Sequence, residues 1–235
     1  MSPLDRTARI AGAVYLSMAV TAPFSMMYVP RILIATGDAT VTARNVLAHE
    51  TLFRFGIVGE LATAIILILL VMALHRLLSG VNENQARFMV GLVLVSAAIT
   101  FVNVVNNIAA LTLFRGADFL SVFDKPQREG LAMLFLRLHS QGNFVNEIFW
   151  GLWLLPFGLL VIRSGFLPRV LGVLLIVNCF GYLASSLTWL LLPAHGIAVS
   201  VATMPALLGE LWIMLWLLIK GAKVPRPVAE SSDAG

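Results

Sequence analysis

Three apolar stretches of the chain each contain a polar side chain that a membrane interior would normally exclude. They are Glu60, Asn103 and Glu147. Each stretch has a basic side chain at one end, and a count of about 20 residues from it gives the opposite boundary of the hydrocarbon. All three polar side chains then lie about four residues, or roughly 6 Å, inside that boundary. The sequence therefore predicts a polar layer at one depth, built by three different helices.

The stretch RLHSQGNFVNEIFWGLW (137–153) adds further polar groups to this layer. At about 100° per residue, four of them share one face of a helix: His139, Asn143, Asn146 and Glu147. Arg137 and Gln141 fall on the opposite face. We expect the first face to line a pocket, which gives the following candidate residues: Glu60, Asn103, Asn107, His139, Asn143, Asn146 and Glu147. Asn178 and Glu210 lie further from this boundary and predict a second, deeper polar layer near the midplane.

A charged side chain at the centre of a membrane helix costs about 2.5–3.5 kcal/mol on insertion scales. Glu60, Glu147 and Glu210 have no Lys or Arg at matching depth. We therefore expect each carboxyl group to be protonated, bound to a cation or exposed to water. We also expect amides such as Asn103 and Asn143 to hydrogen-bond to the carboxyl groups of the upper layer.

Other chemistries for these residues have weaker support. His139 with Glu60 and Glu147 could bind a metal ion, but the carboxylates lie about two helical turns from His139 and no HExxH pattern occurs. No glycine-rich phosphate loop or nucleophile elbow is present. The amides could also serve only to join helices, at about 0.6 kcal/mol each. We predict no metal and no cofactor.

The composition predicts that membrane-spanning helices position these side chains. The chain has 235 residues, of which 12% are charged, and its mean hydropathy is +0.91. Apolar runs of about 18 residues or more are typical of spanning helices. Spans are predicted near residues 10–29, 56–75, 88–107, 143–162, 170–192 and 198–219. The predicted fold is all-α, an integral membrane bundle of six helices in a single domain (1–220), with a disordered cytoplasmic tail (221–235).

The first connection between spans is long enough to hold a helix of its own. Val41, Asn45, Ala48, Leu52 and Phe55 recur there at helical spacing. This pattern predicts a short amphipathic helix at the membrane interface. We expect that helix to lie over the mouth of the pocket.

The basic residues predict the orientation of the bundle. Leaving Arg137 aside, nine Lys and Arg lie on the side of the N-terminus and six on the other side, in longer connections. The positive-inside rule then places both termini in the cytoplasm. The net charge of +4 is spread among loops, which indicates no nucleic-acid partner. The expected partners are the lipid bilayer and a small ligand, and the single Cys179 excludes a disulfide within the chain.

Three stretches carry a family resemblance: RIAGAVYL (9–16), the pattern GDATVTARN…LFR (37–54) and LHSQG…FWGLWLLPFGLLVIRSGFLPRVLG (138–172). They resemble the bacterial membrane family catalogued as domain of unknown function 4386. The matching positions are Arg9, Gly12, Tyr15, Asp38, Asn45, Arg54, His139, Gly151, Gly165, Pro168 and Gly172. The resemblance implies a six-helix protein of the bacterial inner (plasma) membrane and implies no activity.

The leading functional hypothesis is that a pocket in the non-cytoplasmic half binds or passes a small polar or amphipathic ligand. Glu60 or Glu147 would couple this event to a proton. One alternative is a membrane-embedded enzyme, metal-assisted through His139. Another is a structural or regulatory partner of a second membrane protein, in which the polar layer serves only to fix the packing of the helices.

Overall fold

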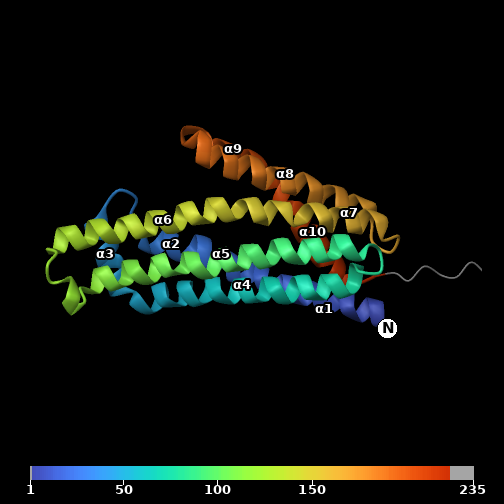
Figure 1. Ribbon diagram of the computed structural model, residues 1–235, viewed down its shortest axis with the longest axis horizontal. Helices are drawn as coiled ribbons and strands as arrows, with labels where there is room; N and C mark the ends of the chain where they lie inside the picture. Colours follow the sequence, from blue (N-terminus) through green and yellow to red (C-terminus); the bar gives the residue numbers. More distant parts are fainter. Residues whose placement is uncertain (1, 223–235) are drawn as a thin grey trace, which may run out of the picture.

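The computed structural model describes residues 2–222, which are almost entirely helical (Figure 1). No strand occurs in this part of the chain, so the fold is all-α as predicted. The elements in order are α1 (Pro3–Pro23), a π-helical turn (Phe24–Tyr28), α2 (Val29–Leu33), α3 (Ala39–Ala48), α4 (Glu50–Leu78), α5 (Glu83–Arg115), a 3-10 turn (Asp118–Leu120), α6 (Lys125–Leu152), α7 (Leu154–Arg163), α8 (Arg169–Leu191), a 3-10 turn (Pro193–His195), α9 (Gly196–Thr203), a 3-10 turn (Met204–Leu207) and α10 (Leu208–Ile219). From residue 223 on, the predicted tail lies outside the described residues.

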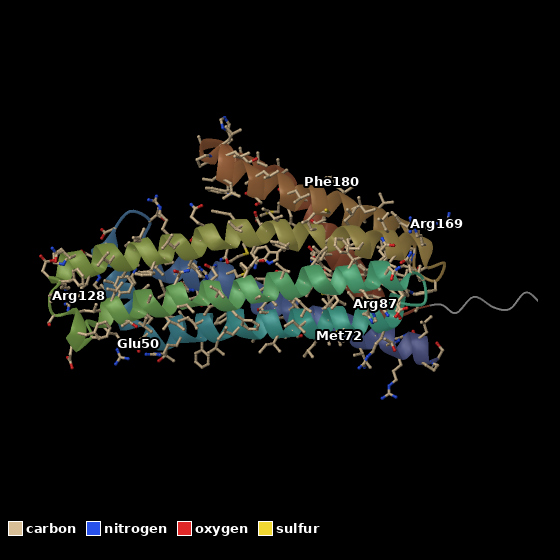
Figure 2. All side chains as sticks on the ribbon, in the orientation of Figure 1. Glu50, Met72, Arg87, Arg128, Arg169 and Phe180 are labelled. Carbon is tan, nitrogen blue, oxygen red and sulfur yellow. The ribbon has the colours of Figure 1, made fainter. Side chains whose placement is uncertain are left out.

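Six helical segments in residues 2–222 are long and apolar enough to cross a membrane, which confirms the predicted six-span bundle. They are Pro3–Leu33, Glu50–Leu78, Glu83–Arg115, Lys125–Arg163, Arg169–Leu191 and Pro193–Ile219. The longer ones exceed what a bilayer requires. At 33 residues, α5 is about 50 Å long, against a hydrocarbon thickness of about 30 Å. Part of the bundle therefore projects beyond the hydrocarbon. Charged side chains lie toward both of its ends, Glu50 and Arg128 at one and Arg87 and Arg169 at the other (Figure 2).

Side-chain and glycine caps fix where the central helices begin and end. Asp124 accepts a hydrogen bond from the backbone N–H of Gln127, whose side chain accepts one from the backbone N–H of Asp124, and this capping box starts α6. Asn82 caps α5 and Asp38 caps α3 through their side-chain oxygens. Gly116 ends α5 with a φ of 68°, which an L side chain rarely adopts. These caps produce short, sharp connections between long antiparallel helices.

The six spans form a ring. Along it, α1 packs against α4, α4 against α5, α5 against α6, the α6–α7 span against α8, and α8 against α10, which returns to α1. Figure 1 shows α8 and α9 diverging from the other spans toward the end of the bundle that carries α3. We call this end the α3 end and the other, where the chain begins, the N-terminal end. Because α10 is short, it fills the gap between α1 and α8 only near the N-terminal end.

Two separate apolar cores stabilise the bundle. The larger lies toward the N-terminal end and includes Tyr15, Leu74, Phe157 and Leu217. The smaller lies at the α3 end, where α2 and α3 pack beside α4, α5 and α6. The second core explains how the long helices remain ordered beyond the bilayer, since their projecting ends bury apolar side chains against one another.

The helix predicted in the first connection exists as α3, but the predicted apolar face is wrong. The backbone breaks at His49, whose φ and ψ are −126° and 42°, so the pattern does not continue into α4 as one helix. The side of α3 that is buried carries Ala43 and Val46, whereas Ala48 and Phe55 are exposed. This face contacts the second core because α3 packs on α5 and α6.

Three of the spans are interrupted where they border the centre of the ring. The first contains the π-helical turn directly after Pro23. The fourth breaks between α6 and α7 near Pro156, which has no N–H to donate to the preceding turn. The sixth contains the 3-10 turn Met204–Leu207. Each break redirects the side chains that follow it, and each adjoins residues of the cavity described below.

Candidate functional site

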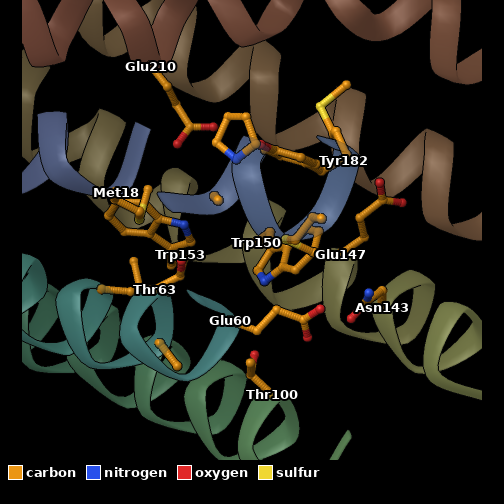
Figure 3. A pocket seen from close by; sticks show the side chains of 16 residues that line it. Met18, Glu60, Thr63, Thr100, Asn143, Glu147, Trp150, Trp153, Tyr182 and Glu210 are labelled. Carbon is orange, nitrogen blue, oxygen red and sulfur yellow. The ribbon is translucent and has the colours of Figure 1, made fainter. Parts of the chain in front are cut away.

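The centre of the ring holds a cavity of about 380 Å³. All six spans contribute to its wall, and most of the lining residues come from the first, second and fourth (Figure 3). The lining residues are Met18, Ala22, Pro23, Met26, Met27, Glu60, Thr63, Ala64, Leu67, Thr100, Asn143, Glu147, Trp150, Trp153, Tyr182 and Glu210. Met27 is 64% exposed, so the cavity reaches the outer surface of the bundle beside the π-helical turn. We call this opening beside Met27 the mouth of the cavity.

Three carboxyl groups line this one cavity. Glu60 comes from α4, Glu147 from α6 and Glu210 from α10, and Figure 3 shows them around a common space. The sequence placed Glu210 in a separate, deeper layer, because residue counting assumes a straight helix. The 3-10 turn breaks the sixth span, so Glu210 lies in the first turn of α10 rather than in the middle of a long helix. The two predicted layers therefore meet in a single cavity.

Glu60 has a basic partner that the depth count missed. Nε2 of His139 lies 2.8 Å from Oε2 of Glu60, and both side chains are almost fully buried. Helical side chains lean toward the N-terminus of their own helix. Because α4 starts at the α3 end, the side chain of Glu60 leans toward His139, although the two Cα atoms differ in depth. The sequence analysis looked only for Lys and Arg at the depth of Glu60, so it did not predict that the imidazole of His139 pairs with this carboxyl group.

The amide of Asn103 connects α5 to α6. Its Nδ2 donates to the backbone carbonyl of His139 and to Oδ1 of Asn143, both at 2.9 Å. Asn106 donates in turn to Oδ1 of Asn103 at 3.1 Å. Gly142 makes room for this amide, since a Cβ at that position would collide with Asn103. The predicted hydrogen bonds from Asn103 and Asn143 to the carboxyl groups do not form among the described residues: Asn103 instead holds the backbone that carries His139, and Asn143 accepts from Asn103.

The remaining sequence candidates divide between packing and a smaller cavity. Asn146 is fully buried and donates to Oγ1 of Thr100 at 2.9 Å and to the carbonyl of Ser96 at 3.3 Å, so it joins α6 to α5 and does not line the main cavity. Asn107 lines a second cavity of about 100 Å³ at the α3 end. As the helical wheel predicts, His139 and Asn146 point inward whereas Arg137 and Gln141 are exposed.

The Glu60–His139 pair lies between the two cavities. Glu60, Asn143 and Met26 line both of them, and His139 lines the smaller one. The smaller cavity is bordered further out by residues of α2 and of the start of α4. A path from the main cavity toward the α3 end would therefore pass this pair.

Glu210 is held by two neutral donors. Tyr15 donates its hydroxyl to Oε2 of Glu210, and Nδ2 of Asn178 donates to Oε1 at 2.7 Å. The sequence assigned Asn178 and Glu210 to the deeper layer but missed Tyr15, whose only signal is its place within the RIAGAVYL stretch. By contrast, Oε2 of Glu147 is buried and has no hydrogen-bond partner among the described residues.

Aromatic rings form much of the remaining wall, and sequence reasoning missed them as well. Trp150 lies edge-on to Tyr182, with ring centroids 6.4 Å apart. Trp153 stacks on Phe157 at 5.5 Å. The sequence analysis followed only polar side chains within the predicted spans, so it did not identify these two rings as part of the wall.

His139 and Glu60 are close enough to be two ligands of one metal ion, but the described residues contain no third ligand beside them. Within residues 2–222, no three His, Cys, Asp or Glu side chains lie close enough together to hold one metal ion. Glu147, which sequence reasoning considered as a co-ligand, lines the main cavity, whereas His139 lines the smaller one.

Comparison with known proteins places the chain in a family. The family model of the domain of unknown function DUF4386 matches residues 10–221. The chain belongs to the DUF4386 family. This member is 30% identical to an uncharacterized protein from Archaeoglobus fulgidus over 175 residues, which cover 74% of this chain and 89% of that protein. No solved structure matches the chain significantly.

Several positions that carry the DUF4386 resemblance have specific contacts in this structure. Tyr15 donates to Glu210, and His139 contacts Glu60. Nη1 of Arg9 donates to the backbone carbonyl of Leu218 at 3.3 Å, which ties the start of α1 to the end of α10. The same two helices approach closely at Gly12, where any side chain would meet the backbone of Leu218. The resembling positions thus include partners of two carboxyl groups of the cavity and the crossing of α1 with α10.

Proposed function

We propose that the central cavity binds a small molecule with polar and apolar parts and allows it to pass between the bilayer and the α3 end. The observation that carries this proposal is the single cavity that three carboxyl groups line from three spans. Its volume falls within the range of about 300–1,000 Å³ that is typical of small-molecule sites. Most of its wall is apolar, its mouth lies beside the exposed Met27, and a smaller cavity continues toward the α3 end.

Proton exchange would accompany this binding. A carboxyl group inside a membrane bundle is either protonated or compensated by a positive charge. Glu60 with His139, and Glu147 with its unpartnered oxygen, are the groups placed to exchange a proton when a ligand arrives. Such residues within spanning segments commonly mark substrate paths and proton relays.

We place the protein in the plasma membrane of a bacterium, with both termini in the cytoplasm. The excess of basic residues at the N-terminal end supports this orientation. The α3 end, with the second core, would then project outside the cell.

Reporter fusions test the orientation. Green fluorescent protein fused to the C-terminus is expected to fluoresce, and alkaline phosphatase inserted at Asp118 is expected to be active, because the first folds in the cytoplasm and the second only outside it. A C-terminal fusion of alkaline phosphatase is the matched control and should be inactive. The opposite pattern would reverse the orientation and the direction of the proposed path.

Filling the cavity tests the binding site. Ala64 is 3% exposed and lines the cavity, so Ala64→Trp should occupy much of it. The neighbouring Ile65 is 51% exposed, and Ile65→Trp serves as the control because its side chain points away from the cavity. The probes are tetraphenylphosphonium, triphenylphosphine oxide and tetraphenylborate, which share phenyl groups and differ in charge.

The measurement is the Tm of the purified protein in detergent with each probe. A ligand that binds only the folded state at about 100 times its Kd adds about 2.7 kcal/mol to the free energy of unfolding. At least one probe should therefore raise the Tm of the wild type and of Ile65→Trp but not that of Ala64→Trp. If no probe raises the Tm of the wild type, or if Ala64→Trp responds equally, the cavity is not a ligand site.

A further inference from the structure

The charges around the cavity indicate what kind of molecule it takes. We propose that the ligand is a lipophilic organic cation and that Glu147 is its counter-ion; this rests on the proposed function of the cavity as a ligand site. Glu60, Glu147 and Glu210 line the cavity, and no Lys, Arg or His side chain does so within residues 2–222. An anionic ligand would therefore find no positive side chain in this lining, and any ionised carboxyl group there would repel it strongly in a medium of low dielectric constant.

Glu147 is singled out because the other two carboxyl groups have partners. Glu60 contacts His139 at 2.8 Å, and both oxygens of Glu210 accept hydrogen bonds, from Tyr15 and from Asn178. Oε2 of Glu147 is buried without a partner. A buried polar atom of this kind costs free energy until something binds it. A cation in the cavity would supply the missing interaction.

The rest of the wall suits a cation with an apolar body. Trp150 and Trp153 present indole rings, the best faces for cation–π attraction. Met18, Met26 and Met27 line the side nearest the mouth, and methionine side chains adapt to irregular apolar shapes. A molecule of this class would enter from the lipid, because its body is soluble there and the mouth lies beside the exposed Met27.

Binding would exchange one positive charge for another at Glu147. In the empty cavity the proton remains on the carboxyl group, since no basic side chain faces it. When the cation binds, the proton leaves to water and the carboxylate pairs with the ligand. The titratable groups of the neighbouring helices that line or support the cavity are Glu60 with His139, Tyr182, and Glu210 with Tyr15.

Calorimetric titration of the protein in lipid nanodiscs tests the inference, with empty nanodiscs as the blank. The probes are tetraphenylphosphonium, the cation, and triphenylphosphine oxide, its neutral counterpart. The variant is Glu147→Gln, which keeps the shape and removes the charge. The control is Glu50→Gln, whose carboxylate lies at the start of α4, outside the cavity.

We expect Glu147→Gln to weaken tetraphenylphosphonium binding by about tenfold or more. The affinity of this variant for triphenylphosphine oxide should change by less than about twofold, and this retained binding also shows that the variant is folded. Glu50→Gln should change the affinity for neither probe. Titration of the wild type in two buffers of different ionisation enthalpy should show release of about one proton per tetraphenylphosphonium bound.

The outcomes separate this inference from the proposal on which it rests. If triphenylphosphine oxide binds as tightly as tetraphenylphosphonium, and neither depends on Glu147, the cavity is a site for neutral ligands and the cation inference is wrong. Cation binding without proton release would overturn the exchange at Glu147. If neither probe binds the wild type, the proposed ligand site itself fails.

Discussion

His139→Ala is expected to lower the free energy of unfolding by about 3–5 kcal/mol, because it leaves the buried carboxyl group of Glu60 without its partner. Glu60→Gln should cost only about 0.5–1.5 kcal/mol, since an amide still hydrogen-bonds to the imidazole. Reversible unfolding in mixed detergent micelles measures both values. His195→Ala is the control, because His195 is exposed and its loss should cost less than about 0.5 kcal/mol.

The double variant His139→Ala/Glu60→Gln distinguishes a paired contact from simple packing. Most of the stability lost in His139→Ala would come from the carboxyl group of Glu60, which is left without a partner. Replacing that group with an amide should therefore restore part of the free energy of unfolding. If the two substitutions instead add, the imidazole and the carboxyl group do not depend on each other, and the pair does not act as a unit between the two cavities.

Gly172→Val is expected to destabilise the protein by about 1–3 kcal/mol and to push α8 away from α7. A Cβ at Gly172 would lie 2.5 Å from the carbonyl oxygen of Gly158 and 3.0 Å from the backbone nitrogen of Ile162, so backbone rather than a flexible side chain must move. The same crossing continues toward Gly151, which approaches the carbonyl of Cys179. Unfolding measurements and a disulfide-crosslinking distance scan between α7 and α8 would detect the change.

Gly91→Ala provides the matched control for this crossing. Gly91 also lies within a spanning helix, but nothing lies within 4 Å of the position of an added Cβ. Alanine there should be neutral or stabilise by up to about 1 kcal/mol through its higher helix propensity. Equal losses in Gly172→Val and Gly91→Ala would mean that glycine is needed for flexibility of the helices and not for their close approach.

Much of the architecture was predictable because a membrane-spanning helix has a clear hydropathy pattern in the sequence. Every backbone polar group in a bilayer must be satisfied within its own helix, so each span requires a long, uninterrupted apolar run. The positions of the helix ends were harder to predict. At the α3 end the helices are held together by a second apolar core that includes Val46, Phe53 and Leu136, and the predicted spans did not extend that far. The hydropathy of α4, α5 and α6 therefore underestimated their length.

The candidate site was predictable only in part, for reasons of local geometry. Depth counting brought Glu60 and Glu147 together because both lie on long, regular segments. It separated them from Glu210 because the break at Met204–Leu207 has no simple hydropathy signal. It also missed the contact of His139 with Glu60, since counting locates Cα atoms and ignores the direction of the side chain. The partners of Asn103 depend on Gly142, whose role is visible only once α5 and α6 are packed.

The first span can lose one residue at the π-helical turn Phe24–Tyr28 without a change in the register of its other side chains. A π turn contains one residue more than the α-helix on either side of it requires. Deleting one residue there would convert the turn to α-helix and leave Tyr15 and Val29 in their present registers. A deletion elsewhere in the span would rotate every later side chain by about 100° and shift it by about 1.5 Å. Homologous chains that differ in length by one residue in this span should therefore carry the gap at this turn, beside the mouth of the cavity.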